Sequence, residues 1–556
     1  MTYLGSSFAA HRRPEIPPHP TPSPSGGEGF SKKIIAALIL ALAMAWLPVV
    51  AQAQTPVRGG IVVQAIGADP PTMNPGTTTD TTAWSLMGKM FNGLTYLDGE
   101  YHNHPDLAES WSVSADGLTY TFKLRRNVKW HDGKPFTSED VKFSYLEILS
   151  NFHPVGRIGY ALVAAIETPD PHTAVIKLKA PFGPFVFMTA LPTGAIMPKH
   201  LLAGQDISTA EFNRKPVGTG PFKLGEAVKG SHYVLERNPY YFKKGQPYLD
   251  RVVLRVMPNP ASRVLAFEKG EVDVLYTFFL PVEQAGRLKA MPGLVVKEYM
   301  VFPEVVTLFF NLKDSKPLGD LRVRQAIAHA IDKKFLVEKG YFGQGRPAIS
   351  PIPSNLGWAH NPRVSVYAYD PAQAAALFDE AGYPKGAGGE RLTLRMVYDP
   401  ANSAANKASE VVAQQLRAVG INAKQMPMER SLMLDKVYKQ YDFDIHIHNY
   451  TTYGDPAVGV TRVYMCDNIR PVPFANVSRY CNPKVDELFR QAASAPSQAE
   501  RARYYAPAME QLARDLPSIP LFEYGDTNVA RGRVQGIFKS LSAHARWDEV
   551  WVSDGK

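Results

Sequence analysis

Cysteine is scarce in this sequence. Only two of the 556 residues are cysteines, Cys466 and Cys481, which excludes a disulfide-dense scaffold. It also leaves no set of adjacent ligands for a cysteine-based zinc site. Two cysteines separated by about 15 residues are expected to pair once a protein reaches an oxidising compartment. We therefore predict a Cys466–Cys481 disulfide, with two inert buried thiols as the alternative.

Catalytic signatures are absent as well. The sequence contains no G-x-S-x-G, H-E-x-x-H or P-loop motif, the patterns that mark common hydrolases and nucleotide-binding enzymes. His131 and Asp132 are adjacent in a Trp-His-Asp-Gly segment, but an Asp-Gly pair is typical of a turn. An exported hydrolase is therefore the weaker alternative, and neither an enzyme activity nor a cofactor is expected.

A concentrated basic segment is also missing. The net charge is +9, yet lysine and arginine are scattered along the chain and form no block of the kind that follows nucleic-acid phosphates. Nucleic acid is therefore not expected as a partner. With 45% hydrophobic residues, the chain has the composition of an ordinary globular protein that buries a large core.

Long apolar runs are confined to one segment near the N-terminus. Residues 34–50 form an apolar run, preceded by Lys32 and Lys33 and followed by Ala51-Gln52-Ala53. A positive flank, a short apolar core and an A-x-A ending are typical of a secretory signal peptide. The alternative is a membrane anchor, because a run of 17 residues is at the lower edge of spanning length. Pro48 interrupts the run, and we predict cleavage after Ala53.

Residues 1–53 are accordingly interpreted as an N-terminal extension and signal peptide. The part before the signal is rich in proline, serine and glycine and cannot bury a core. The mature chain would begin at Gln54 and be exported without a lipid anchor, since no cysteine lies at the cleavage site. Its remaining length of about 500 residues suggests about three domains.

The sequence pattern changes near residue 300. Before it, residues 95–214 indicate a compact α+β unit, with a hairpin at 111–124 that turns at Asp116-Gly117 and a capping box at 137–140. After it, strands and helices alternate, which favours a doubly wound α/β domain. Strands are expected at 305–311, 392–397 and 443–449. One helix is expected at 409–419, and two others are expected to begin at Asp320 and Asp370.

Short motifs occur along the chain in an order that is specific to one protein family. They are Asp69–Pro75 (DPPTMNP), Phe91–Asp98 (FNGLTYLD), Leu107–Val113 (LAESWSV), Trp130–Ser138 (WHDGKPFTS), Val217–Phe222 (VGTGPF), Glu236–Tyr241 (ERNPYY), Asp320–Lys333 (DLRVRQAIAHAIDK) and Gly454-Asp455-Pro456. With these motifs the chain resembles the family 5 solute-binding proteins of bacterial ABC importers, the extracellular oligopeptide-, dipeptide- and nickel-binding group. The resemblance covers residues 57–545.

This resemblance implies a two-lobed α/β fold of the periplasmic binding protein type, with an extra α+β domain on the first lobe. Two strands would join the lobes as a hinge, and a solute would be enclosed when the lobes close. Carried over to this sequence, lobe I comprises 57–94, 215–300 and 525–556, the extra domain 95–214, and lobe II 301–524.

The resemblance also implies a function. A periplasmic solute-binding component of an ABC importer would capture a peptide or similarly sized solute in the interlobe cleft. It would then deliver the solute unchanged to the permease complex at the inner membrane, acting as a monomer. A periplasmic chaperone or a signalling receptor on the same scaffold is the alternative. The residues leave the solute open between a peptide, an amine, a sugar-like molecule and a metal chelate.

The residues that usually grip a peptide in these relatives are replaced here. In peptide-binding relatives, an aspartate just upstream of Gly-Asp-Pro pairs with the α-ammonium, and that position is Thr452 in this chain. Dipeptide binders hold the α-carboxylate with an arginine and a tyrosine, which align with Asp399 and Ala401. Neither end of a free dipeptide would therefore be held in the usual way.

We predict a ligand site that contains Asp399, Tyr450, Thr452, Tyr453 and Asp455. The two aspartates would face a cationic or hydroxyl-rich solute, and the two tyrosines would line the cleft. The alternatives are turn positions for both aspartates and core or rim positions for the tyrosines.

Histidine pairs raise the question of a metal site. His446 and His448 are two residues apart in an expected strand, so their side chains point to the same side. That spacing permits metal binding, but two hydrogen-bonded histidines on one face are the simpler interpretation, and the same holds for His102 and His104. No metal site is therefore predicted.

Overall fold

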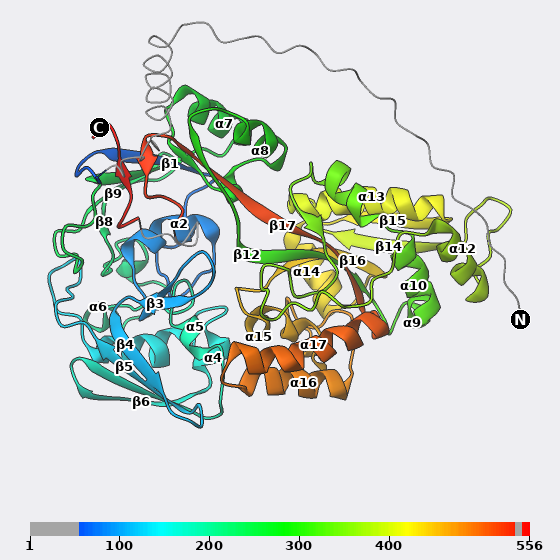
Figure 1. Ribbon diagram of the computed structural model, residues 1–556, viewed down its shortest axis with the longest axis horizontal. Coiled ribbons are helices and arrows are strands. Elements are labelled where there is room, and N and C mark those ends of the chain that lie inside the picture. Colours follow the sequence, from blue (N-terminus) through cyan, green and yellow to red (C-terminus); the bar gives the residue numbers. More distant parts are fainter. Residues whose placement is uncertain (1–54, 540–546, 556) are drawn as a thin grey trace, which may run out of the picture. The chain divides into compact units, whose positions relative to one another are not determined.

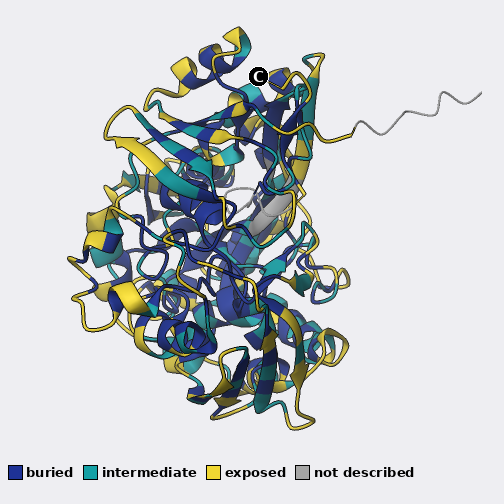
Figure 2. Cartoon of the chain, turned by 90° about the vertical axis from the view of Figure 1, so that its left-hand side faces the viewer, coloured by how far each residue is buried: buried dark blue, intermediate teal, exposed yellow. Residues whose placement is uncertain are grey.

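The computed structural model (Figure 1) describes residues 55–539 and 547–555. The predicted signal peptide and the cleavage position after Ala53 lie outside these residues. Within the described part of the chain, no helix combines the length and the apolar character needed to cross a membrane. Residues from Pro56 onward form one compact unit, in which buried residues gather inside and exposed residues lie mainly on outer loops and helix faces (Figure 2).

One mixed sheet of 11 strands extends through this unit. Its strands are β1 (Ile61–Ile66), β8 (Phe222–Val228), β9 (His232–Arg237), β10 (Arg251–Val256), β11 (Val274–Leu275), β12 (Leu294–Phe310), β13 (Arg346–Pro347), β14 (Leu392–Tyr398), β15 (Ile421–Pro427), β16 (Ile445–Thr451) and β17 (Ser518–Arg531). Their order is β15-β14-β16-β12-β17-β11-β1-β10-β9-β8, and β13 pairs with β17. The sheet therefore joins segments that are far apart in the sequence.

Strands β12 and β17 connect the two ends of this sheet. Residues 294–298 of β12 pair with 527–531 of β17, and residues 304–309 pair with 518–524, with a register shift before Glu304. Beyond that shift β12 also pairs with β16, while the other end of β17 pairs with β11. The predicted lobe boundaries, at 300/301 and 524/525, fall close to this shift. The division into lobes and the two-strand hinge remain predictions.

Helices cover both faces of the sheet around β1. The helices here are α2 (Thr81–Met90), α7 (Pro260–Lys269) and α8 (Val282–Lys289). Because side chains alternate along a strand, Val62 and Ile66 pack in the cluster that contains α2, and Ala65 packs with α7 and α8. Asp80 and Asn259 cap α2 and α7 by accepting hydrogen bonds from backbone N–H groups of the first turn, at 2.9 and 3.0 Å.

Residues 95–214 contain a separate antiparallel sheet in the order β4-β5-β7-β6. The elements of this extra unit are β2 (Thr95–Leu97), β3 (Asn103–Pro105), β4 (Ala108–Val113), β5 (Thr119–Leu124), α3 (Ser138–Phe143), α4 (Arg157–Tyr160), β6 (Val163–Asp170), β7 (Thr173–Leu178), α5 (Phe185–Met188) and α6 (Lys199–Leu202). The predicted hairpin and capping box are confirmed, since Gly117 turns between β4 and β5 with φ +69° and Thr137 and Asp140 exchange hydrogen bonds at the start of α3. Phe122 belongs to the same buried cluster as Val62, so this unit shares its core with the β1 region.

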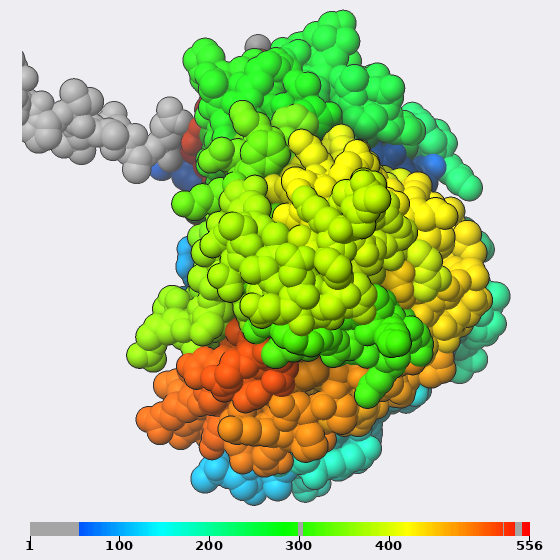
Figure 3. Space-filling model, turned by 90° about the vertical axis from the view of Figure 1, so that its right-hand side faces the viewer, coloured from blue at the N-terminus to red at the C-terminus, as the bar shows by residue number. Residues whose placement is uncertain are grey.

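The second half of the chain has the predicted α/β character. Its helices are α9 (Lys316–Gly319), α10 (Leu321–His329), α11 (Lys333–Phe335), α12 (Pro371–Glu380), α13 (Ser403–Ala418), α14 (Arg430–Leu434), α15 (Pro456–Gly459), α16 (Pro483–Ser494) and α17 (Gln498–Asp515). Strand β14, helix α13 and strand β15 form a β-α-β unit with parallel strands. Asp320 and Asp370 cap α10 and α12, where the sequence predicted helix starts. These segments, coloured green through orange, cover most of the face in Figure 3.

The predicted disulfide between Cys466 and Cys481 is present, with the two Cα atoms 4.6 Å apart. The backbone N–H of Cys466 also donates to both carboxylate oxygens of Asp486, each at 3.2 Å. Apart from a single 3-10 turn at Cys466–Asn468, the segment that the bridge closes contains no regular element. The crosslink therefore replaces the backbone ladder that would otherwise hold this segment.

Removing this crosslink is expected to lower stability. For a bridge with a sequence separation of 15 residues, the chain-entropy model predicts a loss of about 3 kcal/mol in the free energy of unfolding of a Cys466→Ser/Cys481→Ser variant. Urea denaturation followed by tryptophan fluorescence measures this loss. A reducing agent should destabilise the wild type to the same extent and leave the variant unchanged, and an unshifted midpoint in the variant would contradict a structural role.

Lys89 of α2 is fully buried. Its Nζ donates to the Ser85 carbonyl oxygen at 2.6 Å and lies 4.2 Å from the centre of the Trp547 ring. Burial lowers the pKa of Lys89 from 10.5 to about 7, because the charged form loses its hydration. Between these two pH values the unfolded chain binds more protons than the native protein, so stability should increase as the pH rises through this range.

The substitution Lys89→Met should remove this pH dependence. Between about pH 7.5 and 9.5, the free energy of unfolding of the wild type should rise relative to that of the variant by up to about 1.4 kcal/mol per pH unit. Guanidinium denaturation at several pH values measures both curves. Lys142→Met, at an exposed position of α3, is the matched control and should run parallel to the wild type. Parallel curves for Lys89→Met would show that Lys89 is not the titrating group.

Candidate ligand-binding site

A cavity of about 1010 Å³ is bounded by segments from three parts of the sequence. Thr79, Thr81 and Phe278 come from the region around β1, and residues between Pro154 and Ile158 come from the extra unit. The remaining wall is formed by the end of β16 with the segment after it, by Glu304 of β12, by the disulfide-closed segment between Asn468 and Ala475, and by Pro192, Asn402 and Arg430 of α14. A cavity of this size accommodates a ligand at least as large as a short peptide.

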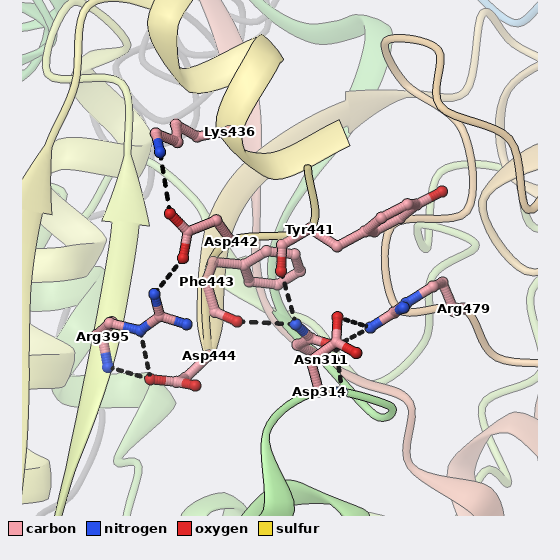
Figure 4. Close-up of polar contacts among 9 residues, drawn as sticks. All are labelled: Asn311, Asp314, Arg395, Lys436, Tyr441, Asp442, Phe443, Asp444 and Arg479. Atoms are coloured by element: carbon pink, nitrogen blue, oxygen red, sulfur yellow. Dashed lines mark hydrogen bonds and ion pairs between the residues drawn. The ribbon is translucent and has the colours of Figure 1, made fainter. Parts of the chain in front are cut away.

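A polar network fixes the start of β16, the strand that leads into the cavity (Figure 4). The Asn311 side chain, just after β12, donates hydrogen bonds to the carbonyl oxygens of Tyr441 and Phe443, both at 2.9 Å. Arg395 of β14 donates to one carboxylate oxygen of Asp444 from its backbone N–H at 2.8 Å and from Nε at 3.1 Å. These contacts hold β16 between β12 and β14, and so they determine where the residues at the other end of β16 lie.

Positive charge dominates the cavity wall. Four arginines line it, Arg157, Arg430, Arg462 and Arg470, while Glu304 is the one carboxylate among the described lining residues. Within the described part of the chain, only Arg430 of these four has a carboxylate within 4.0 Å. Guanidinium groups that the protein does not neutralise, placed on a concave wall, produce a positive potential inside it. The charge of the wall therefore favours binding of an anionic ligand.

Two of these arginines lie over aromatic rings of the same wall. Arg430 lies 5.7 Å from the centre of the Phe474 ring and 3.8 Å from the carboxylate of Asp399. Arg462 lies 5.9 Å from the centre of the Tyr453 ring. Stacking and ion pairing restrict the rotamers of these long side chains, so less entropy is lost when a ligand binds them.

The same two aromatic residues have unusual backbone conformations. Tyr453 has φ +50° and Phe474 has φ +62°, in the left-handed region that non-glycine residues rarely adopt. Such strain persists where the surrounding structure imposes it, often at binding sites. Next to Tyr453, a Cβ on Gly454 would lie 2.7 Å from atoms of both Tyr101 and Phe187, so the loop after β16 packs directly on the extra unit.

Among the predicted ligand residues, Tyr450 and Tyr453 line the cavity. Tyr450 is 8% exposed, and its hydroxyl forms a hydrogen bond with the hydroxyl of Tyr438. Thr452 lies between them in the sequence but is buried, with only 1% of its surface exposed. Its hydroxyl accepts a hydrogen bond from the Gly454 backbone N–H at 3.3 Å. Thr452 thus supports the loop that presents the two tyrosines.

The two predicted aspartates lie behind the cavity wall. Asp455 and Asp399 are 3% and 2% exposed, and neither lines the cavity. Asp455 caps α15 by accepting a hydrogen bond from Ala457 at 2.9 Å, and its two oxygens accept hydrogen bonds from both terminal nitrogens of the buried Arg501, at 2.7 and 2.6 Å. Asp399 accepts a hydrogen bond from the Ala401 backbone at 2.9 Å. Both carboxylates therefore bind protein groups in this structure.

The histidine pair of β16 is also buried. The rings of His446 and His448 are stacked with centres 5.5 Å apart, and His446 Nδ1 lies 3.0 Å from the Val397 carbonyl oxygen. Burial lowers the pKa of His446 to about 4 and that of His448 well below its ordinary value, so both are neutral near pH 7. His448 lines the cavity, but the described residues contain no cluster of three histidine, cysteine or carboxylate side chains that could hold a metal.

The other histidine pair lies elsewhere. Both His102 and His104 face Asp98, at 3.3 and 2.8 Å.

The charged residues of the wall were not among the predicted ligand residues. The four arginines come from distant positions, and nothing in the sequence distinguishes them from other surface arginines; they are Arg157, Arg430, Arg462 and Arg470. Glu304 directly precedes the expected strand 305–311 and belongs to no motif. A usable signal was the cysteine pair, because the segment that it closes includes Arg470 and Phe474.

The Asp455–Arg501 pair leads to a stability prediction. Asp455→Ala should lower the free energy of unfolding by about 3–5 kcal/mol, because the guanidinium of Arg501 would remain buried without its partner. Adding Arg501→Leu should recover part of this loss, which a double-mutant cycle of urea denaturation measures. Asp467→Ala, at a side chain that is 66% exposed, is the control. Unchanged stability with weakened ligand binding in Asp455→Ala would instead favour a direct ligand contact.

Comparison with protein families and curated proteins gives matches over most of the chain. Residues 103–470 match the family model described as bacterial extracellular solute-binding proteins, family 5 Middle. The chain is 29% identical over 467 residues to the glutathione-binding protein GsiB of Escherichia coli strain K12, a match that covers 83% of this chain and 88% of that protein.

Solved structures with the same fold include bound complexes. The periplasmic binding protein DppA of Helicobacter pylori, in complex with the peptide STSA, is 26% identical with a TM-score of 0.75 and covers 89% of this chain and 98% of its own. NikA of Brucella suis, in complex with Fe(III)-EDTA, is 25% identical with a TM-score of 0.78 and covers 89% of this chain and 100% of its own.

Proposed function

The chain belongs to family 5 of the bacterial extracellular solute-binding proteins, as its motifs predicted, and we propose that it captures a net-anionic solute of peptide size. Its fold is that of the two-lobed periplasmic binding proteins, and its role is that of the solute-binding component of an ABC importer. The family binds solutes and is not a catalytic one. A solute that contacts both sides of the cavity stabilises the closed form, and no covalent step is required.

The excess of arginine on the cavity wall is the observation that supports an anionic solute. Four guanidinium groups and one carboxylate are the charged groups among the described residues that line it. Two unit charges about 4 Å apart interact by about 4 kcal/mol at an effective dielectric constant near 20, so a wall of this charge discriminates strongly between anions and cations. The two aspartates that would have attracted a cation are buried behind the wall and bind protein groups. A cationic solute is therefore disfavoured.

Arg430 has the contacts expected of a carboxylate receptor. Its guanidinium lies 3.8 Å from the Asp399 carboxylate and 5.7 Å from the centre of the Phe474 ring. A planar guanidinium in a restricted orientation can donate two parallel hydrogen bonds to a carboxylate or phosphate. We propose that Asp399 acts through Arg430 as a positioning residue. An arginine from α14 would then replace the one that dipeptide binders carry at the position of Asp399.

The ligands named for similar proteins are compatible with this charge. Glutathione, for which GsiB is named, carries more carboxylates than ammonium groups, and the Fe(III)-EDTA bound by NikA is also an anion. DppA binds a short peptide. These ligands differ in shape, and two of them share a surplus of carboxylates. Acidic peptides are therefore the first ligand class to test.

We further propose where and how capture occurs. Residues 1–53 would direct export to the periplasm with cleavage after Ala53, and the loaded protein would deliver its solute to the permease complex. Lobe I (57–94, 215–300 and 525–556), with the extra domain, would move relative to lobe II (301–524) about strands β12 and β17. The register shift beside Glu304 supports this position for the hinge, because an irregular ladder bends more easily than a regular one.

Acidic peptides should bind the mature protein, and basic peptides of the same length should not. Isothermal titration calorimetry with glutathione, triaspartate, triglycine and trilysine tests this expectation. Binding of an acidic peptide should weaken with increasing salt, because screening acts on the arginine wall. Binding of trilysine as tight as that of triaspartate would overturn the proposed ligand class.

Arginine substitutions test the wall itself. Arg430→Gln and Arg462→Gln should each weaken binding of an acidic peptide by about tenfold or more, since a hydrogen bond to a charged group contributes about 1.5–3 kcal/mol. Arg417→Gln, at an exposed position of α13, is the matched control and should bind like the wild type. Equal affinities for all three variants would exclude these two arginines from the ligand contacts.

A further inference from the structure

His448 of β16 is a buried polar side chain that reaches the cavity. It is 4% exposed, and it lines the cavity together with Tyr450, two residues further along the same strand. The residue opposite it on β12 is Thr307, whose hydroxyl donates to the Val305 carbonyl oxygen at 3.2 Å. The hydroxyl that lies closest along the strand pair is therefore already used by the backbone.

The imidazole of His448 is not satisfied by the protein. Its Nδ1 is enclosed and has no hydrogen-bond partner among the described residues. In contrast, His446 can donate from Nδ1 to the Val397 carbonyl oxygen at 3.0 Å, and His446 does not line the cavity. Buried polar side chains usually have a partner, so an exception needs an explanation. At the wall of a cavity, the simplest explanation is a ligand.

Aromatic rings fix the plane of the His448 imidazole. The imidazole stacks with the ring of His446, with centres 5.5 Å apart, and with the ring of Phe474, with centres 5.8 Å apart. The Tyr450 ring lies edge-on to it at 5.5 Å. These contacts restrict the imidazole without using its nitrogens. A polar group that is oriented in advance loses less entropy when a ligand binds to it.

Two arginines of the wall act on the same imidazole. Burial is the main reason why the pKa of His448 is well below its ordinary value, and the charges of His446, Arg430 and Arg462 lower it further. Arg430 also lies over the Phe474 ring with which His448 stacks. Near pH 7 the imidazole is neutral and has one N–H group. An anion bound by the two guanidinium groups would therefore lie near a neutral donor.

We propose that Nε2–H of His448 donates a hydrogen bond to the acidic group of the ligand that Arg430 and Arg462 bind. This inference rests on the proposed function, which assigns the acidic groups of the ligand to the arginines. A proton on the enclosed Nδ1 would be a buried donor without an acceptor, which proteins avoid. The proton therefore belongs on Nε2. A donor at this position selects a deprotonated acidic group, whose oxygens only accept hydrogen bonds.

Substitution of His448 tests this contact. His448→Phe keeps a ring for the stack and removes the donor, so binding of glutathione and of triaspartate should weaken about tenfold or more. His448→Gln carries a side-chain N–H at a similar reach and should recover most of the affinity. His102→Phe, at an exposed position of the extra unit, is the matched control and should bind like the wild type. Calorimetry gives the affinities.

Ligands that each lack one acidic group identify the group that His448 binds. Four derivatives of triaspartate serve this purpose, namely three in which one aspartate is replaced by alanine and one with a C-terminal amide. A double-mutant cycle of protein and ligand gives the coupling between His448→Phe and each removed carboxylate. One derivative should bind the wild type and His448→Phe about equally, because the accepting group is missing. A merely structural role of His448 would weaken all four alike.

The possible outcomes separate this inference from the function on which it rests. Wild-type affinity in His448→Phe, an equal loss for all four derivatives, or a His448→Gln variant as weak as His448→Phe would overturn the role of His448 and leave capture of an anionic solute intact. Wild-type protein that binds neither glutathione nor triaspartate would overturn both. Thermal unfolding checks that each variant is folded, and His448→Leu replaces His448→Phe in both experiments if the latter does not fold.

Discussion

The antiparallel pairing of β12 with β17 is the constraint on which the rest of the structure depends. Both strands continue through the large sheet, and the register between them shifts beside Glu304 and again between Val306 and Thr307. On one side of the shift beside Glu304, β17 pairs with β11, which in turn pairs with β1. On the other side, β12 pairs with β16, the strand that leads into the cavity. The positions of the tyrosines, of the following loop and of Glu304 all follow from this one pairing, which is why side chains from distant parts of the sequence face the same cavity.

Charge is used in two different ways around this cavity. Asp455 and Arg501 bind each other in the interior, where a lone ion would be costly, and their pairing holds the loop after β16. Most arginines of the wall have no carboxylate within 4.0 Å among the described residues, so they can bind an acidic ligand. Aromatic rings such as Phe474 restrict their motion. A carboxylate behind the wall therefore serves the structure, and a guanidinium on the wall is available to a ligand.

Much of the fold could be predicted from the sequence, because it depends on local chemistry. The capping box at Thr137, the hairpin turn at Gly117 and the cysteine pair are each determined by a few neighbouring residues, and the ordered motifs identified the family. The site was harder to predict. Tyr450 and Tyr453 line the cavity, but the direction in which Asp455 faces depends on Arg501, which is 46 residues away. The arginines of the wall come from several separate segments, and no spacing rule connects them. Charge sign could be read from the sequence, while the side of the wall on which each charge lies required the three-dimensional arrangement.

The crosslink between Cys466 and Cys481 has a consequence for the order of events in the cell. The segment that it closes supplies part of the cavity wall, including Arg470 and Phe474. In the cytoplasm, thiols are kept reduced, so a newly made chain has all of its strands available but lacks the covalent tie that holds this part of the wall. Oxidation after export would then form this tie. In a chain that is exported, as the N-terminal segment predicts, maturation of the binding surface would thereby be linked to translocation.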